Sequence, residues 1–263
     1  MINKVSHLYS NWLLNKPKHI LFILSIILIL LSTSIPYFKL DASADSLILE
    51  NDKDLKTYRD TLRRYQTKEF LVMTFTPNKG DIFDGRNLNL LENLKNQLMK
   101  IKGIDSITTL IDVPLVKSSD LSYTEMISDV PTIFSEGVDK EKARQEILNS
   151  PIYKEFVISK DGKTSGILVY IKTDKKLADL IRTKNNYLDK RDKGQLAGEE
   201  KKEYKKFLKE YDNYKKSYNQ KNHQNINEIR IVIEKYKDTA KIHLGGIPMI
   251  ADDMMTYIKN DII

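Results

Sequence analysis

The feature that most limits what this chain can fold into is an apolar stretch near its start, HILFILSIILILLSTSIPYF, residues 19–38. The 19 residues from Ile20 to Phe38 carry no formal charge, and as a helix they would be about 28 Å long. That length is close to the roughly 30 Å hydrocarbon thickness of a bilayer. A helix of a soluble domain would show a polar face, whereas only three serines and one threonine interrupt this stretch. We therefore predict a transmembrane helix over residues 19–38.

The same stretch has an alternative interpretation as a cleaved export signal. Ala42-Ser43-Ala44 offers the small-x-small pattern of a cleavage site soon after the apolar residues. Against this, the stretch is longer than the roughly 7 to 15 apolar residues of an export signal, and 18 residues precede it. We therefore expect an uncleaved anchor.

Charges on the two sides of the predicted span indicate its orientation. Lys4, Lys16 and Lys18 precede the span, whereas acidic residues follow it at positions 41, 45 and 50. Because lysine-rich flanks stay in the cytoplasm, we expect the N-terminus on the cytoplasmic side of a bacterial inner membrane. Residues 39–263 would then be periplasmic or otherwise extracytoplasmic. Residues 1–18 have apolar residues at helical spacing and a tryptophan, which predicts a cytoplasmic amphipathic lead-in.

The formal net charge of +7 invites a nucleic-acid interpretation, but the location of the charge argues against it. Residues 1–38 carry +3, and residues 189–221, with 11 basic and 7 acidic side chains, carry +4. Everything else together is close to neutral, so we expect no nucleic-acid partner. The chain has no cysteine, which excludes disulfides, thiolate metal ligands and cysteine nucleophiles.

Residues 39–263 alternate between strand and helix patterns, which predicts an α+β domain. Strands are predicted at 69–77, 104–111 and 240–247, and a β-hairpin at 156–172 around Lys160-Asp161-Gly162-Lys163. Helices are predicted at 52–65, 88–101, 138–150 and 248–263. The first two strands and the helix between them form a β-α-β unit of ordinary length. Residues 112–138 contain two prolines and a glycine among scattered apolar residues, and we expect them to be irregular.

A segment rich in lysine and tyrosine separates the predicted β-hairpin from the last strand. Its apolar and aromatic residues recur at helical spacing, and Gly194 and Gly198 bracket a turn. We therefore predict a helical-hairpin insertion over residues 174–237, with coiled-coil character. Its tyrosines form either the seam between two helices, with the lysines on a solvated face, or part of an arm that contacts a partner or an anionic lipid surface.

No residue pattern supports a catalytic centre, a metal site or a cofactor. The histidines, at positions 7, 19, 223 and 243, have no companions at metal-ligand spacing, and neither GxxxxGK[ST] nor GxSxG occurs. His243 is interpreted as a packed or edge residue of a strand. Asp252 and Asp253, adjacent on a predicted helix, point about 100° apart and cannot share a proton as a catalytic dyad. We interpret them as favourable charges near a helix N-terminus, and we expect the chain not to be an enzyme.

The order of these parts resembles the N-terminal portion of a resistance-nodulation-division (RND) transporter. The matching parts are the basic start, the single span, the acidic linker DASADSLILENDKDL, the β-α-β domain and the terminal GGIPMIADDMMTYIKNDI. The similarity is to the hydrophobe/amphiphile exporter branch, related to mycobacterial lipid transporters (MMPL-like) and sterol-sensing-domain proteins. It covers essentially all 263 residues, and GGIPMIADDM together with the anchor is its most specific part.

The resemblance implies a ferredoxin-like porter domain in a proton-driven exporter of lipids or other hydrophobic or amphiphilic compounds. The family's proton-relay acids lie in later spanning helices, so none is assigned here, and Asp252 and Asp253 match the helix before the second span. The implied partners are membrane lipids, the substrate, and the remaining spans or other subunits, since this segment is not a complete transporter. Two alternatives remain: a single-pass anchored module that binds a lipid or partner without transport, and an assembly subunit whose helical arm docks a partner.

Overall fold

The computed structural model describes residues 17–33, 61, 68–118 and 130–262. Its contacts divide the chain into two units, residues 1–42 and 43–263. In the first unit, helix α2 (Pro17–Ser32) begins at a proline, whose missing N–H costs nothing in the first turn. None of the residues of α2 is buried.

Helix α2 coincides with the first part of the predicted span. It has 16 residues, about 24 Å of helix, and residues 34–38 of the prediction lie outside the described residues. Within the described ranges, no helix combines the length and the apolar character needed to cross a membrane. The span over residues 19–38 therefore stays a prediction. The lead-in up to residue 16 and, apart from Thr61, the predicted helix at 52–65 also lie outside the described residues.

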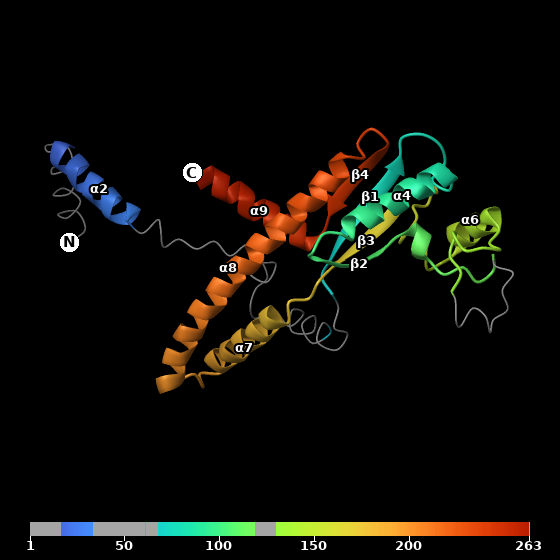
Figure 1. Cartoon of the computed structure of the whole chain (residues 1–263). Helices are drawn as coiled ribbons and strands as arrows, with labels where there is room; N and C mark the ends of the chain where they lie inside the picture. Colours follow the sequence, from blue (N-terminus) through green and yellow to red (C-terminus); the bar gives the residue numbers. More distant parts are fainter. Residues whose placement is uncertain (1–16, 34–60, 62–67, 119–129, 263) are drawn as a thin grey trace, which may run out of the picture. The chain divides into compact units, whose positions relative to one another are not determined.

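The second unit is built on a four-stranded antiparallel sheet (Figure 1). Its strands, in the spatial order β2-β3-β1-β4, are β1 (Phe70–Pro77), β2 (Ile104–Thr108), β3 (Ser165–Ile171) and β4 (Ala240–Gly245). Strand β1 pairs with β3 on one side and with β4 on the other, and β2 pairs with β3. Strands β1 and β2 are therefore not neighbours, because β3 runs between them. The connections form two interlocked split β-α-β units, which confirms the α+β class.

The helices of this unit follow the predicted order. They are α4 (Gly85–Leu98), α6 (Lys140–Asn149), α7 (Lys175–Asp192), α8 (Gly198–Glu234) and α9 (Ile247–Ile262). The strands predicted at 69–77 and 240–247 and the helices predicted at 88–101, 138–150 and 248–263 are confirmed with small changes of boundary. The strand predicted at 104–111 stops at Thr108 because a 3-10 turn, Leu110–Asp112, follows, capped by the hydroxyl of Thr109.

The β-hairpin predicted at 156–172 is confirmed in part. Strand β3 is its second arm, whereas the first arm is too short to form a strand and pairs with residues 164–166 through an isolated antiparallel bridge between Ile158 and Ser165 and the two backbone hydrogen bonds beside it. Strand β3 lies inside the sheet, where its two edges already bond to β1 and β2. The first arm approaches its start closely at Gly166, where an added Cβ would lie 2.5 Å from the carbonyl oxygen of Phe156.

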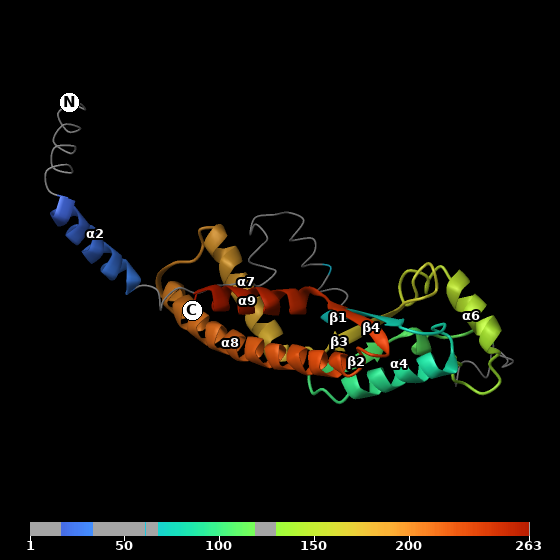
Figure 2. The same ribbon diagram turned by 90° about the horizontal axis from the view of Figure 1, so that it is seen from above.

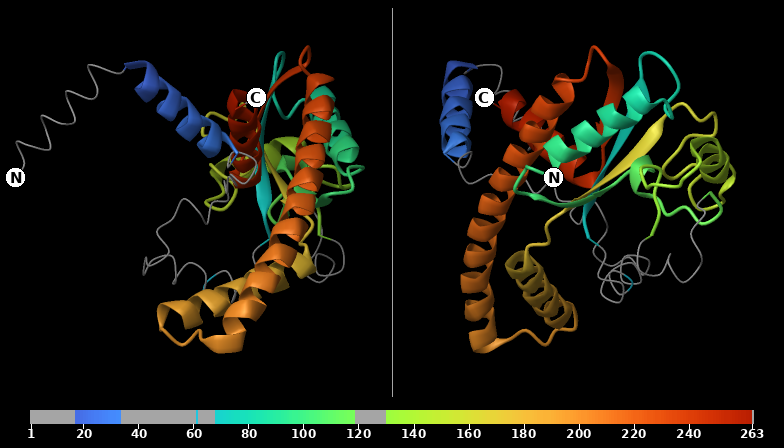
Figure 3. Two further views of the ribbon diagram at one scale, coloured as in Figure 1. Left: turned by 90° about the vertical axis from the view of Figure 1, so that its left-hand side faces the viewer. Right: turned by 45° about the vertical axis from the view of Figure 1, so that its right-hand side comes forward.

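The core lies between one face of the sheet and helices α4 and α8, which Figures 2 and 3 show on the same side of the sheet. The period-two pattern of β1 puts Leu71, Met73 and Phe75 inside, whereas Phe70 and Val72 are largely exposed on the other face. The helices contribute Leu88, Leu91, Leu94 and Leu98 from α4, and Ile229 and Val232 from α8. These spacings of three and four residues bury one stripe of each helix.

Candidate functional site: the arm and the α8–α9 junction

Helix α8 extends well beyond the sheet and pairs there with α7 to form an arm, residues 175–221 (Figure 1). Helix α8 has 37 residues, about 55 Å, and α7 has 18, about 27 Å. Gly194 lies in the connection between them and Gly198 is the first residue of α8, and both have a φ in the left-handed region that favours glycine. A helical hairpin is therefore present, and α8 is one continuous helix from the tip of the arm into the core.

Aromatic side chains form the contact between α7 and α8. The ring of Tyr187 lies 5.0 Å from that of Tyr204 and 5.6 Å from that of Phe207, whose ring is 6.3 Å from Tyr211. These centroid distances are typical of favourable aromatic pairs. The four rings, called here the aromatic seam, give a thin two-helix arm an apolar contact. The first interpretation of the tyrosine stripe, as a helix seam, agrees with this geometry.

Lysines of the arm also cover tyrosine rings. The amine of Lys176 lies 4.7 Å from the ring centre of Tyr214, and that of Lys184 lies 4.8 Å from the ring centre of Tyr211. Both lysines belong to α7 and both rings to α8. These cation–π contacts add to the packing between the two helices.

At the root of the arm, two tyrosines of α8 bond to carboxylates near the sheet. The hydroxyl of Tyr214 donates to both carboxylate oxygens of Asp174, at 3.0 and 2.9 Å, and Asp174 also caps α7. The hydroxyl of Tyr218, one turn further along, donates to Glu69 at 3.0 Å. Burial and the neighbouring Glu69 charge raise the pKa of Tyr218 well above its usual value, and the hydrogen bond to Asp174 raises the pKa of Tyr214.

The raised pKa of Tyr218 predicts that the protein loses stability in alkali. Its phenol holds the proton more tightly in the folded state than in the unfolded state. The contribution of Tyr218 to the free energy of unfolding is therefore complete below about pH 10 and is lost as the pH rises further. We expect Tyr218→Phe to unfold more easily at neutral pH, by about 1 kcal/mol, and to lose less stability than the parent chain between pH 10 and 11. Urea unfolding followed by circular dichroism across this range measures both effects.

The matched control for this substitution is Tyr257→Phe. Tyr257 is 66% exposed on α9, so removal of its hydroxyl should leave the free energy of unfolding at neutral pH nearly unchanged. A pH dependence for Tyr218→Phe that equals the parent's would show that the phenol of Tyr218 does not couple folding to pH.

A second polar cluster holds α9 against α8. Nδ1 of His223 lies 3.0 Å from both carboxylate oxygens of Asp252, which is buried, and Nε2 of His223 lies 2.9 Å from the side-chain nitrogen of Asn227. With Asn227 as donor to Nε2, the proton of the neutral ring sits on Nδ1 and is donated to Asp252. The buried carboxylate is thus satisfied by the neighbouring helix.

The next residue of α9 makes a second bond to α8. Nη2 of Arg230 donates to both carboxylate oxygens of Asp253, at 2.7 and 2.9 Å. The interpretation of Asp252 and Asp253 as helix N-terminal charges is wrong, because the first turn of α9 contains no acidic residue and both side chains pair with α8. This pairing joins positions more than twenty residues apart, and no local pattern in one sequence identifies it.

The remaining residues singled out from the sequence do not gather into a site. His243 is exposed on the edge strand β4, and His19 lies in α2. Within the described ranges, no group of three histidine, aspartate or glutamate side chains could hold a metal ion. A shallow depression at the C-terminal end of α8 is lined by Arg230, Ile231, Glu234 and the capping residue Lys235, so it does not enclose a ligand.

No protein-family model, no curated protein and no solved structure matches the chain. The arm and the α8–α9 junction are therefore identified as candidate functional features from their geometry alone.

Proposed function

We propose that the chain is the N-terminal portion of an RND-type, proton-driven exporter of lipids or other hydrophobic or amphiphilic compounds. It would comprise the first span and the first extracytoplasmic porter domain, in a bacterial inner membrane. The observation that carries the proposal is the sheet order β2-β3-β1-β4 with split β-α-β connections, the order of a ferredoxin-like domain. The topology of the described part of the second unit therefore supports the proposal.

The surface of α2 supports the membrane part of the proposal. Large apolar side chains are exposed around this helix, among them Phe22 at 67% and Leu28 at 68%. Such exposure on every side is unfavourable in water and favourable in lipid. Continued through residues 34–38, the apolar sequence has the length of a span.

Apolar side chains on the face of the sheet away from α4 and α8 support a role in contacting apolar molecules. Phe70 and Val72 are 46% and 39% exposed on this face, and the ring of Phe70 lies 6.1 Å from that of Tyr170 on the neighbouring strand. A porter domain contacts its substrate through surfaces of this kind and needs no catalytic group. Proton coupling would occur in spans that lie outside this segment.

Helix α9 would connect the domain to the membrane part of the exporter. It follows β4 after Gly246, and Asp252 and Asp253 fix it to α8. A movement of the chain beyond α9 would therefore be transmitted to the whole second unit. A second candidate function, a single-pass anchored module that binds lipid or a partner without transport, is favoured by the arm.

Two measurements test the proposal. The coding sequence beyond codon 263 should encode a hydrophobic span within about ten residues, and a stop codon without further transporter sequence would favour the anchored module instead. Because the chain has no cysteine, single cysteines at Ser10 and Asn213 can be labelled selectively in cells. An impermeant maleimide should react from outside with residue 213 and not with residue 10, and labelling of both or neither contradicts the predicted span.

A further inference from the structure

The arm carries a charge equal to that of the whole chain. Residues 175–221 contain 15 basic and 8 acidic side chains, a net charge of +7, and the formal charge of all 263 residues is also +7. The rest of the chain therefore sums to zero. That remainder includes residues 1–38, whose charge of +3 is offset by a charge of −3 in the other residues.

Within the arm, part of this charge lies on one face of α8. Six exposed lysines make up this lysine face: Lys201, Lys202, Lys205, Lys206, Lys209 and Lys216. At 100° per residue they fall within about 140° of the helix circumference, roughly opposite the aromatic seam. They extend over about 22 Å of the helix axis.

The lysine face is not neutralised by the arm's own carboxylates. Among the residues that the structure describes, no ion pair joins these six amines to an acidic side chain, whereas Glu200 pairs with Lys190 of α7 at 2.6 Å. At 100° per residue, Asp212 is the one carboxylate of the arm's α8 segment within the same sector, so the face holds six amines and one carboxylate. Such an excess of amines on a thin helix creates a positive potential that attracts anions.

We propose that the lysine face binds the anionic headgroups of a phospholipid bilayer. The six amines are distributed over about 140° of the helix, but lysine side chains are flexible enough for all of them to reach one membrane surface. Each lysine near an anionic surface adds to the attraction. In Figures 1 and 2 the tip of the arm and the C-terminal end of α9 both lie to the left of the sheet. The contact of the lysine face with lipid adds to the proposed function and does not require transport.

The composition of the face favours lipid over nucleic acid. Binding of single strands uses aromatic rings on which bases stack, and here the rings of Tyr204, Phe207 and Tyr211 are turned into the seam. The face contains lysine and no arginine, so it lacks the planar guanidinium group that binds a single phosphate through two hydrogen bonds. Lysine amines on flexible side chains can instead follow the distributed negative charge of a membrane surface.

The test uses the full chain with a single donor dye on Asn213→Cys, which lies on the lysine face. The protein is reconstituted into vesicles of phosphatidylcholine, with or without phosphatidylglycerol, that carry a headgroup-linked acceptor. We expect stronger energy transfer when phosphatidylglycerol is present. That difference should disappear near 1 M salt, where the screening length falls to about 3 Å.

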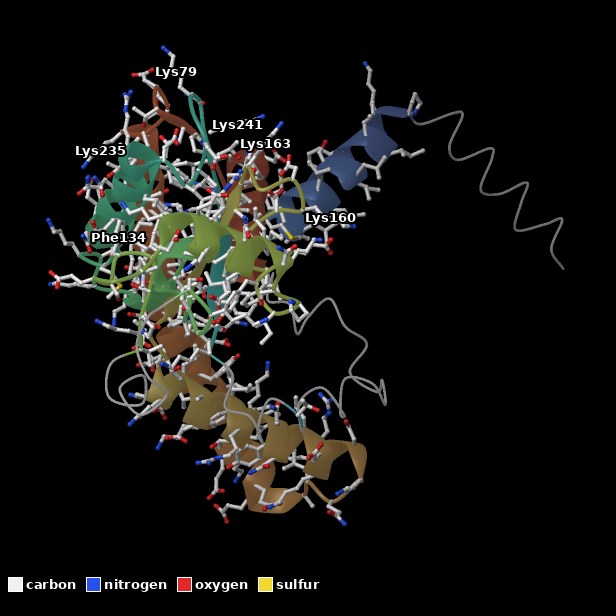
Figure 4. All side chains as sticks on the ribbon, turned by 90° about the vertical axis from the view of Figure 1, so that its right-hand side faces the viewer. Lys79, Phe134, Lys160, Lys163, Lys235 and Lys241 are labelled. Atoms are coloured by element: carbon white, nitrogen blue, oxygen red, sulfur yellow. The ribbon has the colours of Figure 1, made fainter. Side chains whose placement is uncertain are left out.

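Two variants with the same change of charge locate the effect. Replacing Lys201, Lys205, Lys209 and Lys216 by glutamine should abolish the dependence on phosphatidylglycerol. Figure 4 shows Lys79, Lys163, Lys235 and Lys241 at the end of the domain opposite the arm. Replacing these four lysines by glutamine should leave the dependence on phosphatidylglycerol intact. Circular dichroism establishes that both variants keep their helices.

Three results would overturn the proposal. Equal energy transfer with and without phosphatidylglycerol shows that anionic headgroups do not attract the arm. Equal loss in the two variants shows that net charge alone is responsible. A third is that the arm variant keeps its vesicle response and loses binding of a fluorescent single-stranded oligonucleotide, which would assign the face to nucleic acid.

Discussion

Replacing Ile229 by alanine is expected to lower the free energy of unfolding of the second unit by about 2–5 kcal/mol. Ile229 is 1% exposed and packs in the core between α8 and the sheet. The substitution removes buried methyl groups and leaves a cavity, because the strands on the other side of the core cannot move in to fill it. Urea unfolding monitored by circular dichroism measures the loss.

Ile231→Ala is the matched control, since Ile231 lies two residues away in the same helix and is 62% exposed. Both substitutions remove the same atoms and change helix propensity equally. We expect Ile231→Ala to change the free energy of unfolding by no more than about 0.5 kcal/mol. Similar losses in the two variants would mean that α8 faces the sheet with a different side.

Gly246→Ala is the second substitution for which a large effect is expected, about 2–4 kcal/mol. Gly246 has a φ of +123°, a conformation that side-chain-bearing residues rarely adopt. A Cβ there would also lie 3.1 Å from the Cα of Leu71 and 3.2 Å from the carbonyl oxygen of Phe70. Both are backbone atoms of β1 that cannot rotate away, so the turn from β4 into α9 would be displaced.

Gly245→Ala provides the comparison within the same Gly-Gly pair. Its Cβ would meet the carbonyl oxygen of Val72 at 3.8 Å, an ordinary contact, and its φ is not positive. We expect thermal unfolding to show a change of less than about 1 kcal/mol, of either sign, since alanine also restricts the unfolded chain. If Gly246→Ala is as mild as Gly245→Ala, the turn does not require glycine.

Helices and strands whose apolar residues repeat within one contiguous segment could be predicted. Leu88, Leu91, Leu94 and Leu98 repeat at helical spacing because one side of α4 faces the core, so the helix follows from one contiguous segment. The alternation in β1 has the same origin. The aromatic seam was also accessible, because tyrosines at near-heptad spacing in a segment interrupted by glycines indicate two helices packed together.

Features that depend on distant segments could not be predicted. The sequence indicated only the short pairing of β3 with the adjacent residues 157–159, whereas its main partners, β1 and β2, lie far back along the chain. The pairing of Asp252 with His223, and of Asp253 with Arg230, likewise depends on how α9 packs against α8. Such contacts are set by three-dimensional packing and leave no period in the sequence.

Because α8 is continuous, a force on the arm would be transmitted to the core. Between Glu199 and Glu234 the helix contains neither proline nor glycine, the usual causes of a kink, so it has no hinge between the lysine face and Ile229. A force on the outer end of such a rod acts as a torque at its inner end. A surface that binds the lysine face and moves would therefore rotate the sheet. Helix α9 would rotate with it, because Asp252 and Asp253 bond α9 to α8.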